Sequence, residues 1–231
     1  MAVNSKKLLT RRAALARLAV FFAVLTLAAP PQPLVVTGPP QSVITRHPIV
    51  CAHTRLTDEV EEWKVQRTLS LVREMGAPWI VEYFPWAYSE PAKGPYDFAH
   101  AEMVIEHAYA QGLPVIARLD YVPEWASPKE TTTRYLAPAR YDDYGDFVYA
   151  FVAHFKDRVR YYVIWNEPNM AAEWGFRQVN PEEYTALLRI AYTRAKEADP
   201  EAVILAAGLA PTLENDPATA INDLTYLQRL Y

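Results

Sequence analysis

The chain has 231 residues, of which 51% are hydrophobic and 22% are charged, and its formal net charge is −4. This composition is that of a globular protein, and it excludes the strong basic excess that nucleic-acid binders carry. A single cysteine, Cys51, excludes an intrachain disulfide. Because Cys51 begins an apolar segment, we expect it to be buried filler.

Residues 1–29 have the layout of an export signal, with a basic start followed by an apolar run, Leu18–Ala29, that ends in small residues. The segment TRRAALA, Thr10–Ala16, also resembles a twin-arginine signal. About 20 apolar residues are needed to cross a bilayer, and this run is shorter. We therefore predict bacterial export, with an uncleaved membrane anchor through residues 13–29 as the alternative. The prolines of residues 30–44 predict an extended linker.

The segment 45–231 alternates between predicted strands and predicted helices. The strands are short apolar runs at Pro48–His53, Trp79–Phe84, Val115–Asp120, Tyr161–Asn166 and Val203–Gly208. Helical patterns lie between them at Glu59–Met75, Phe98–Gln111, Tyr144–Lys156 and from Asn180, a predicted N-cap, to before Asp199. On the second helix we expect His100 and His107 to face solvent.

This alternation predicts an α/β fold with a parallel sheet, because strands buried on both faces read as continuous apolar runs. Two architectures fit: an open doubly wound sheet and a (β/α)8 TIM barrel. No glycine-rich phosphate loop follows the first strand, and polar and aromatic residues follow nearly every strand, which favours the barrel. Because a full barrel has eight βα units and about five are present, we expect residues 45–231 to form an incomplete barrel, the N-terminal part of a longer domain.

The residues that follow the strands are the candidate site, because the C-terminal ends of barrel strands meet at one rim. They are Glu167 and Asn166 after the fourth strand, and His53, Arg55, Glu82, Trp86, Asp120, Tyr121, Trp125 and Trp174. For the aromatic residues the alternative to stacking on sugar rings is core or rim packing. His53 and Arg55 suit hydroxyls or a carboxylate, with a buried histidine as the alternative for His53. Glu82 and Asp120 suit hydroxyls, the orientation of Glu167, or a salt bridge to Arg118.

The pair Asn166-Glu167 has a chemical interpretation. Cleavage of a glycosidic bond needs two carboxyl groups, one of which protonates the leaving oxygen. An apolar setting raises the pKa of such a carboxyl group, and Trp165 and Trp174 are candidates to provide it. Asn166 offers an amide that can hold a sugar hydroxyl. The alternative is ordinary turn and capping chemistry, which a lone Asn-Glu-Pro would favour.

The motif IWNEPN, Ile164–Asn169, together with its surroundings, resembles the retaining glycoside hydrolases of clan A. The similarity is greatest to the β-xylosidase and α-iduronidase family, family 39, and to cellulase-like family 5 enzymes. It is carried also by WAYSEPAKGPYDF, Trp86–Phe98, by IARLDYVPEWA, Ile116–Ala126, and by Pro181–Leu209. The resemblance implies that Glu167 is the acid/base, that Asn166 binds the sugar beside the cleaved bond, and that a nucleophilic Glu follows a seventh strand, beyond this chain. The arginine that many members carry near the end of the second strand is replaced here by Val81.

The sequence thus predicts an exported retaining glycoside hydrolase that binds a poly- or oligosaccharide. It needs no cofactor and no metal: Cys51 and His53 share a strand face, but no third ligand has suitable spacing. A non-catalytic carbohydrate-binding protein, or an inactive fragment, is the alternative. An unrelated barrel such as an aldolase is disfavoured because no lysine ends a strand.

Overall fold

The computed structural model describes residues 42–46 and 48–231. The chain divides into two units, 1–35 and 36–231, and all described residues lie in the second. The predicted signal and most of the predicted linker lie outside the described residues. Within the part of the chain that is described, no helix has both the length and the apolar character needed to cross a membrane.

Five parallel strands form one sheet in the order β1-β2-β3-β4-β5. They are β1 (Ala52–His53), β2 (Ile80–Pro85), β3 (Val115–Asp120), β4 (Tyr161–Ile164) and β5 (Val203–Ala206). The α-helices are α2 (Glu62–Glu74), α3 (Trp86–Ser89), α4 (Ala99–Ala110), α5 (Tyr141–Phe155), α6 (Pro181–Ala198) and α7 (Asp223–Leu230). Short 3-10 helices are η1 (Leu56–Asp58), η2 (Glu124–Ala126), η3 (Pro138–Arg140) and η4 (Ala171–Trp174), and a small hairpin pairs β6 (Asn215–Asp216) with β7 (Ala220–Ile221).

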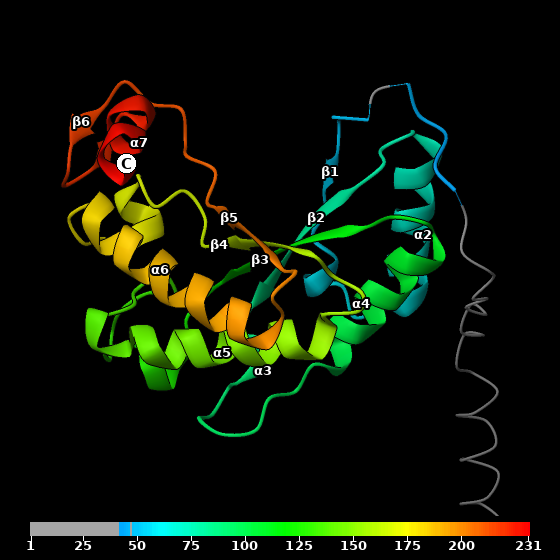
Figure 1. Cartoon of the computed structure of the whole chain (residues 1–231), viewed down its shortest axis with the longest axis horizontal. Coiled ribbons are helices and arrows are strands. Elements are labelled where there is room, and N and C mark those ends of the chain that lie inside the picture. The colour runs from blue at the N-terminus through cyan, green and yellow to red at the C-terminus, as the bar shows by residue number, and fades with distance from the viewer. Residues whose placement is uncertain (1–41, 47) are drawn as a thin grey trace, which may run out of the picture. The chain divides into compact units, whose positions relative to one another are not determined.

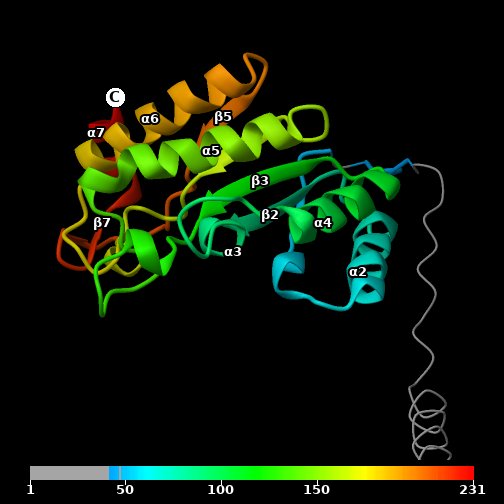
Figure 2. The ribbon, with the colours of Figure 1, turned by 90° about the horizontal axis from the view of Figure 1, so that it is seen from below.

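The helices between successive strands follow one another along one side of the sheet (Figure 1). Figure 2 shows α5 and α6 lying side by side, and Arg194 of α6 donates to Asp146 of α5 at 2.9 Å. His154 of α5 in turn contacts Glu102 of α4 at 2.6 Å. Sequential parallel strands with all crossover helices on one side are the arrangement of a barrel wall. The predicted fold class, an incomplete (β/α)8 barrel, is confirmed.

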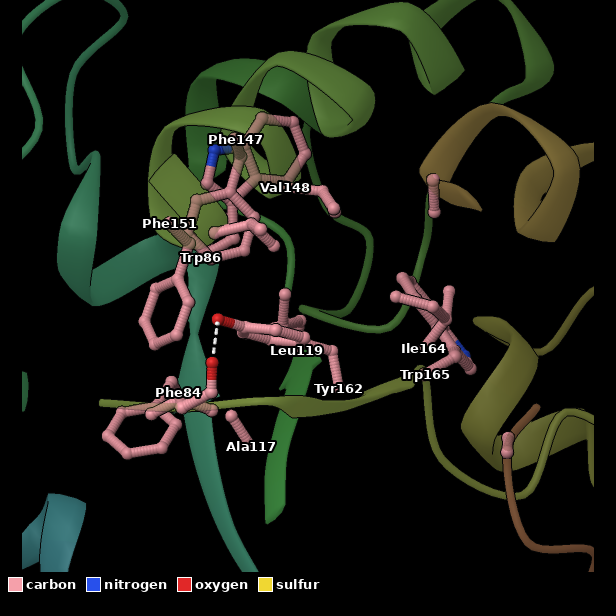
Figure 3. Packing of buried hydrophobic residues seen from close by; sticks show 14 of the residues in the cluster. Phe84, Trp86, Ala117, Leu119, Phe147, Val148, Phe151, Tyr162, Ile164 and Trp165 are labelled. Atoms are coloured by element: carbon pink, nitrogen blue, oxygen red, sulfur yellow. Dashed lines mark hydrogen bonds between the residues drawn. The ribbon is translucent and has the colours of Figure 1, made fainter. Parts of the chain in front are cut away.

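The core lies between the sheet and its helices, and aromatic side chains are prominent in it (Figure 3). Phe151 of α5 packs against Phe84 of β2 at a ring distance of 5.2 Å and against Tyr162 of β4 at 6.3 Å. Burial of one such side chain stabilises the fold by about 1.5–3 kcal/mol. These contacts identify the face of the sheet that carries residues such as Phe84 and Tyr162 as the helix side.

The opposite face carries the residues that alternate with these. Val81, Ile116, Tyr161 and Val203 lie side by side across four strands, and each is half-buried. The next layer towards the C-terminal ends of the strands contains Arg118 of β3, with Tyr83 of β2 and Val163 of β4 beside it. In a barrel this face lines the interior, so residues of this second layer lead towards the active-site rim.

Two smaller expectations are wrong. Cys51 is exposed, because β1 has only two residues and Cys51 precedes it. His107 is buried, because it lies on the side of α4 that faces α2, where its Nε2 contacts the Glu62 carboxylate at 2.8 Å. The predicted cap of α6 is present: the Asn180 side chain accepts a hydrogen bond from the Glu183 backbone at 3.1 Å.

Candidate active site

The chain leaves strands β3 and β4 through left-handed backbone conformations. Tyr121 follows β3 with φ of 56°, and Trp165 and Glu167 follow β4 with φ of 73° and 38°. Each such residue costs about 1–2 kcal/mol when it is not glycine. Backbone contacts hold the two positions after β4: Trp165 N donates to Leu119 O at 3.0 Å, and Glu167 N donates to Gly208 O at 3.2 Å. The strand end is thereby fixed to both neighbouring strands.

Asn166 is oriented by Arg118. The Nη1 of Arg118 donates to Asn166 Oδ1 at 3.0 Å, and the same nitrogen lies 3.3 Å from Nε2 of His53. Because the amide oxygen accepts this bond, the Asn166 NH2 group is left as the donor towards a ligand. Arg118 belongs to the inner face of the sheet, so the contact places the Asn166 amide at the barrel mouth.

Glu167 is half-buried, and its backbone is held on both sides. Its carbonyl accepts from Met170 N at 3.0 Å, in addition to the bond from its own N–H to Gly208. Among the described residues, none forms a hydrogen bond or ion pair with the Glu167 carboxylate. The backbone of Glu167 is therefore held while its carboxylate has no such partner in the described part of the chain.

Asn169, which the sequence reasoning did not single out, closes the loop behind Glu167. Its side chain is fully buried, and its Nδ2 donates to Ala210 O at 2.9 Å and to Ile221 O at 3.0 Å, while its Oδ1 accepts from Ala210 N at 2.9 Å. One side chain thus ties the segment after β4 to the segment after β5 and to β7. Its place in IWNEPN is the only sequence signal, and an Asn in a turn does not show which distant backbone it binds.

Asp120 ends β3 inside a network of charges. It is fully buried and accepts from Arg118 Nε and Arg134 Nη1, both at 2.9 Å. Burial raises the pKa of Asp120, and the two arginines oppose that shift. Arg134 also lies 3.8 Å above the Tyr121 ring and forms an ion pair, without an aligned hydrogen bond, with Glu173 at 3.0 Å. The expected salt bridge between Asp120 and Arg118 is present, whereas Arg134 had been missed.

Glu82 holds a loop instead of facing the mouth. It lies on the same side of β2 as Phe84, which packs under α5, and it is fully buried. Its carboxylate accepts from Thr54 Oγ1 at 2.6 Å, from Leu56 N at 2.9 Å and from Thr57 N at 3.2 Å. These bonds fix the chain after β1, so neither the predicted hydroxyl contact nor the predicted orientation of Glu167 fits its position.

His53 and Arg55 line a cavity of about 250 Å³ at the mouth, with Tyr83, Arg118 and Tyr121. Burial and the nearby Arg118 lower the pKa of His53, so the neutral imidazole is favoured at pH 7. Arg55 is mostly exposed and pairs with Asp58 at 2.8 Å. Among the described residues, no group of His, Cys, Asp or Glu side chains is arranged to hold a metal ion.

The tryptophans separate into two kinds. Trp86 is fully buried against Tyr144 and Phe147, and Trp174 is buried against Trp165. These two rings therefore pack in the core, as the alternative to sugar stacking predicted, because neither has an exposed face for a sugar. Trp125 is half-buried and lines a separate cavity.

Comparisons with known proteins bear on the fold. A family model described as beta-galactosidase, of glycoside hydrolase family 42, matches residues 56–133. No curated protein matches the chain. A solved family 39 glycoside hydrolase from Bacteroides cellulosilyticus WH2 is similar with a TM-score of 0.55 at 20% identity, over 67% of this chain and 30% of that one.

Two further structures are similar to the same degree. A family 39 β-xylosidase from Caulobacter crescentus has a TM-score of 0.55 at 19% identity, over 73% of this chain and 42% of that one. A family 5 glycoside hydrolase from Streptomyces cattleya, in complex with Manβ1-4GlcNAc, has a TM-score of 0.57 at 17% identity, over 79% and 48%. The chain spans less than half the length of these structures. It therefore has part of the (β/α)8 barrel found in clan A glycoside hydrolases, and that fold is what the similarity establishes.

Proposed function

We propose that the protein hydrolyses O-glycosidic bonds of an oligo- or polysaccharide with retention of configuration, and that Glu167 is the acid/base. The observation that carries the proposal is the strand end itself: Glu167 has a strained backbone and no hydrogen-bond or ion-pair partner for its carboxyl group among the described residues, and it follows Asn166, whose amide oxygen accepts from Arg118. Backbone outliers of this kind cluster at functional sites.

The proposed reaction divides into two steps. In the first, a carboxylate attacks the anomeric carbon while Glu167 donates its proton to the leaving oxygen, so that the glycosidic C–O bond breaks as a glycosyl-enzyme bond forms. In the second, the Glu167 carboxylate removes a proton from water, which attacks the anomeric carbon and releases the nucleophile. Asn166 donates its NH2 hydrogens to a hydroxyl oxygen of the sugar beside the cleaved bond.

The nucleophile must lie about 5–5.5 Å from Glu167. Asp120 and Glu82 are fully buried and engaged by other groups, so neither suits attack on a sugar. We therefore propose that a segment outside the described residues supplies this carboxylate. We also propose that residues 1–29 direct export. Because Asp120 and Glu82 are both engaged, the same observation also fits the second candidate function, a protein that binds carbohydrate without cleaving it.

The test uses the protein, extended to its full reading frame, with aryl glycosides of good and poor leaving groups. Glu167→Gln is expected to lower kcat/KM by about 10²–10⁴ on the poor leaving group and much less on the good one, since only the poor one needs a proton. Glu201→Gln is the control, because Glu201 is exposed and lies just before the N-terminal end of β5, whereas Glu167 follows the C-terminal end of β4. Equal losses on both substrates, or none, would remove Glu167 from the acid/base role. Saccharide binding without any turnover by the unmodified protein would favour the second candidate.

A further inference from the structure

A second cavity, of about 630 Å³, lies between the segment after α3 and the loop after β3. It shares no lining residue with the cavity at the mouth, although consecutive residues contribute to the two: Tyr121 lines the first cavity and Val122 lines the second. Tyr121, the residue before Val122, has a left-handed backbone conformation. The volume of the second cavity falls within the range of about 300–1,000 Å³ that small-molecule sites occupy.

Trp125 gives this cavity a fixed aromatic wall. The indole Nε1 donates to Glu90 O at 2.8 Å, and the ring meets Trp86 edge to face at 5.3 Å. These two contacts anchor the indole, which remains half-buried and lines the cavity together with Lys93, whose ammonium lies 5.3 Å from the ring centroid. A ring that is already immobilised loses little conformational entropy when a ligand packs on it. The C–H face of a pyranose offers an apolar surface of matching shape.

The rest of the lining is rich in hydroxyl groups and carries no net charge. Hydroxyls come from Ser127, Thr131, Thr132 and Thr133, and the lining holds two lysines and two glutamates. Ser127 and Thr131 donate to backbone carbonyls, so their oxygens are left as acceptors, and Lys93 pairs with Asp143. A charged ligand gains little from such a balanced lining, whereas a neutral polyhydroxylated one can pair with hydroxyl, ammonium and carboxylate groups together. Such a lining fits a neutral carbohydrate better than a charged one.

We propose that the Trp125 cavity binds a neutral sugar unit of an oligosaccharide, at a distance from the bond cleaved beside Glu167. Its assignment as part of a substrate site rests on the proposed function, whereas the binding itself does not. The substrate class that follows is a neutral oligosaccharide of several units, because a single glycoside cannot occupy the mouth and this cavity together.

The experiment measures binding to the full chain by titration calorimetry, with xylotriose, mannotriose and cellotriose as neutral probes and trigalacturonic acid as the charged comparison. At least one neutral trisaccharide is expected to bind at least about tenfold more tightly than the charged one. Trp125→Ala is expected to weaken that binding at least about tenfold. Thr133→Arg is expected to do the same, because Thr133 is exposed and a long side chain there fills the cavity without disturbing the core.

The control is Tyr88→Ala, which removes an exposed aromatic side chain from a different cavity, between η1 and α4, and is expected to leave binding unchanged. Unaltered affinity in both Trp125→Ala and Thr133→Arg would overturn the proposal, as would preference for trigalacturonic acid or failure to bind any neutral trisaccharide. The two hypotheses fail separately. Intact trisaccharide binding in a protein whose hydrolysis is insensitive to Glu167→Gln would reject only the proposed role of Glu167.

Discussion

Removal of the Asn169 side chain tests whether one buried amide holds the segment after Glu167. Asn169→Ala deletes three hydrogen bonds and leaves the N–H and C=O of Ala210 and the C=O of Ile221 without that partner. A net hydrogen bond contributes about 0.5–1.5 kcal/mol, so the loss in free energy of unfolding is expected to be about 2–4 kcal/mol. Asn169→Asp keeps the acceptor for Ala210 N but sets a carboxylate oxygen against two carbonyl oxygens. We expect it to be at least as destabilising as alanine, because a buried unpaired charge is costly.

The assay is urea unfolding at pH 7, followed by tryptophan fluorescence. Asn215→Ala is the matched control, since Asn215 is exposed in β6, and its stability is expected to stay within about 0.5 kcal/mol of the unmodified protein. Stability of Asn169→Ala within that same margin would show that the loops after β4 and β5 do not depend on this side chain. An Asn169→Asp variant as stable as the unmodified protein would refute the hydrogen-bond assignment itself.

Two further predictions concern single sites. Gly175→Ala is expected to cost at least about 2 kcal/mol in a urea melt, because φ is +72° and the new Cβ would lie 2.6 Å from Tyr135 Cα; Gly208→Ala, where nothing lies within 4 Å, is the control and should be nearly neutral. The folded state lowers the pKa of His53, so the unfolded chain binds its proton first as the pH falls below about 6.5. Stability contributed by neutral His53 is therefore present above that pH and lost below it, where a second cation would face Arg118. Unfolding free energies at pH 7.5 and 5.0 should differ more in the unmodified protein than in His53→Gln, and an equal difference would contradict the assignment.

The barrel wall could be predicted from sequence because its signals are local. The run Val115–Asp120 has the same bounds in the prediction and in the structure, and Asn180 caps its helix as expected. Apolar strands alternating with capped helices leave few topologies. The β6–β7 hairpin could not be predicted, since each of its strands has two residues and β7 is held by a hydrogen bond from the distant Asn169 to Ile221.

The site was harder to predict, because a strand buried on both faces does not reveal which face is the interior. Glu82 and Tyr83 are adjacent in β2, yet Glu82 points to the helix side and Tyr83 lines the mouth cavity. Trp86 follows the same strand but begins α3 and turns into the core. A position after a strand therefore could not show which side chains face the rim. That depends on which face of the strand a residue lies on and on whether a helix begins there.

The conformational cost at the rim argues that its geometry is retained for a purpose other than stability. Tyr121, Trp165 and Glu167 together cost about 3–6 kcal/mol as left-handed non-glycine residues. That is a large part of the about 5–15 kcal/mol by which a folded protein exceeds its unfolded state. Glycine would occupy the same conformations at little cost, so the side chains themselves must be needed there. Trp165 fills the core, whereas the carboxylate of the half-buried Glu167 has no hydrogen-bond or ion-pair partner among the described residues. We infer that Glu167 repays this cost through contact with a ligand, and that its carboxyl group and the oriented amide of Asn166 form one site.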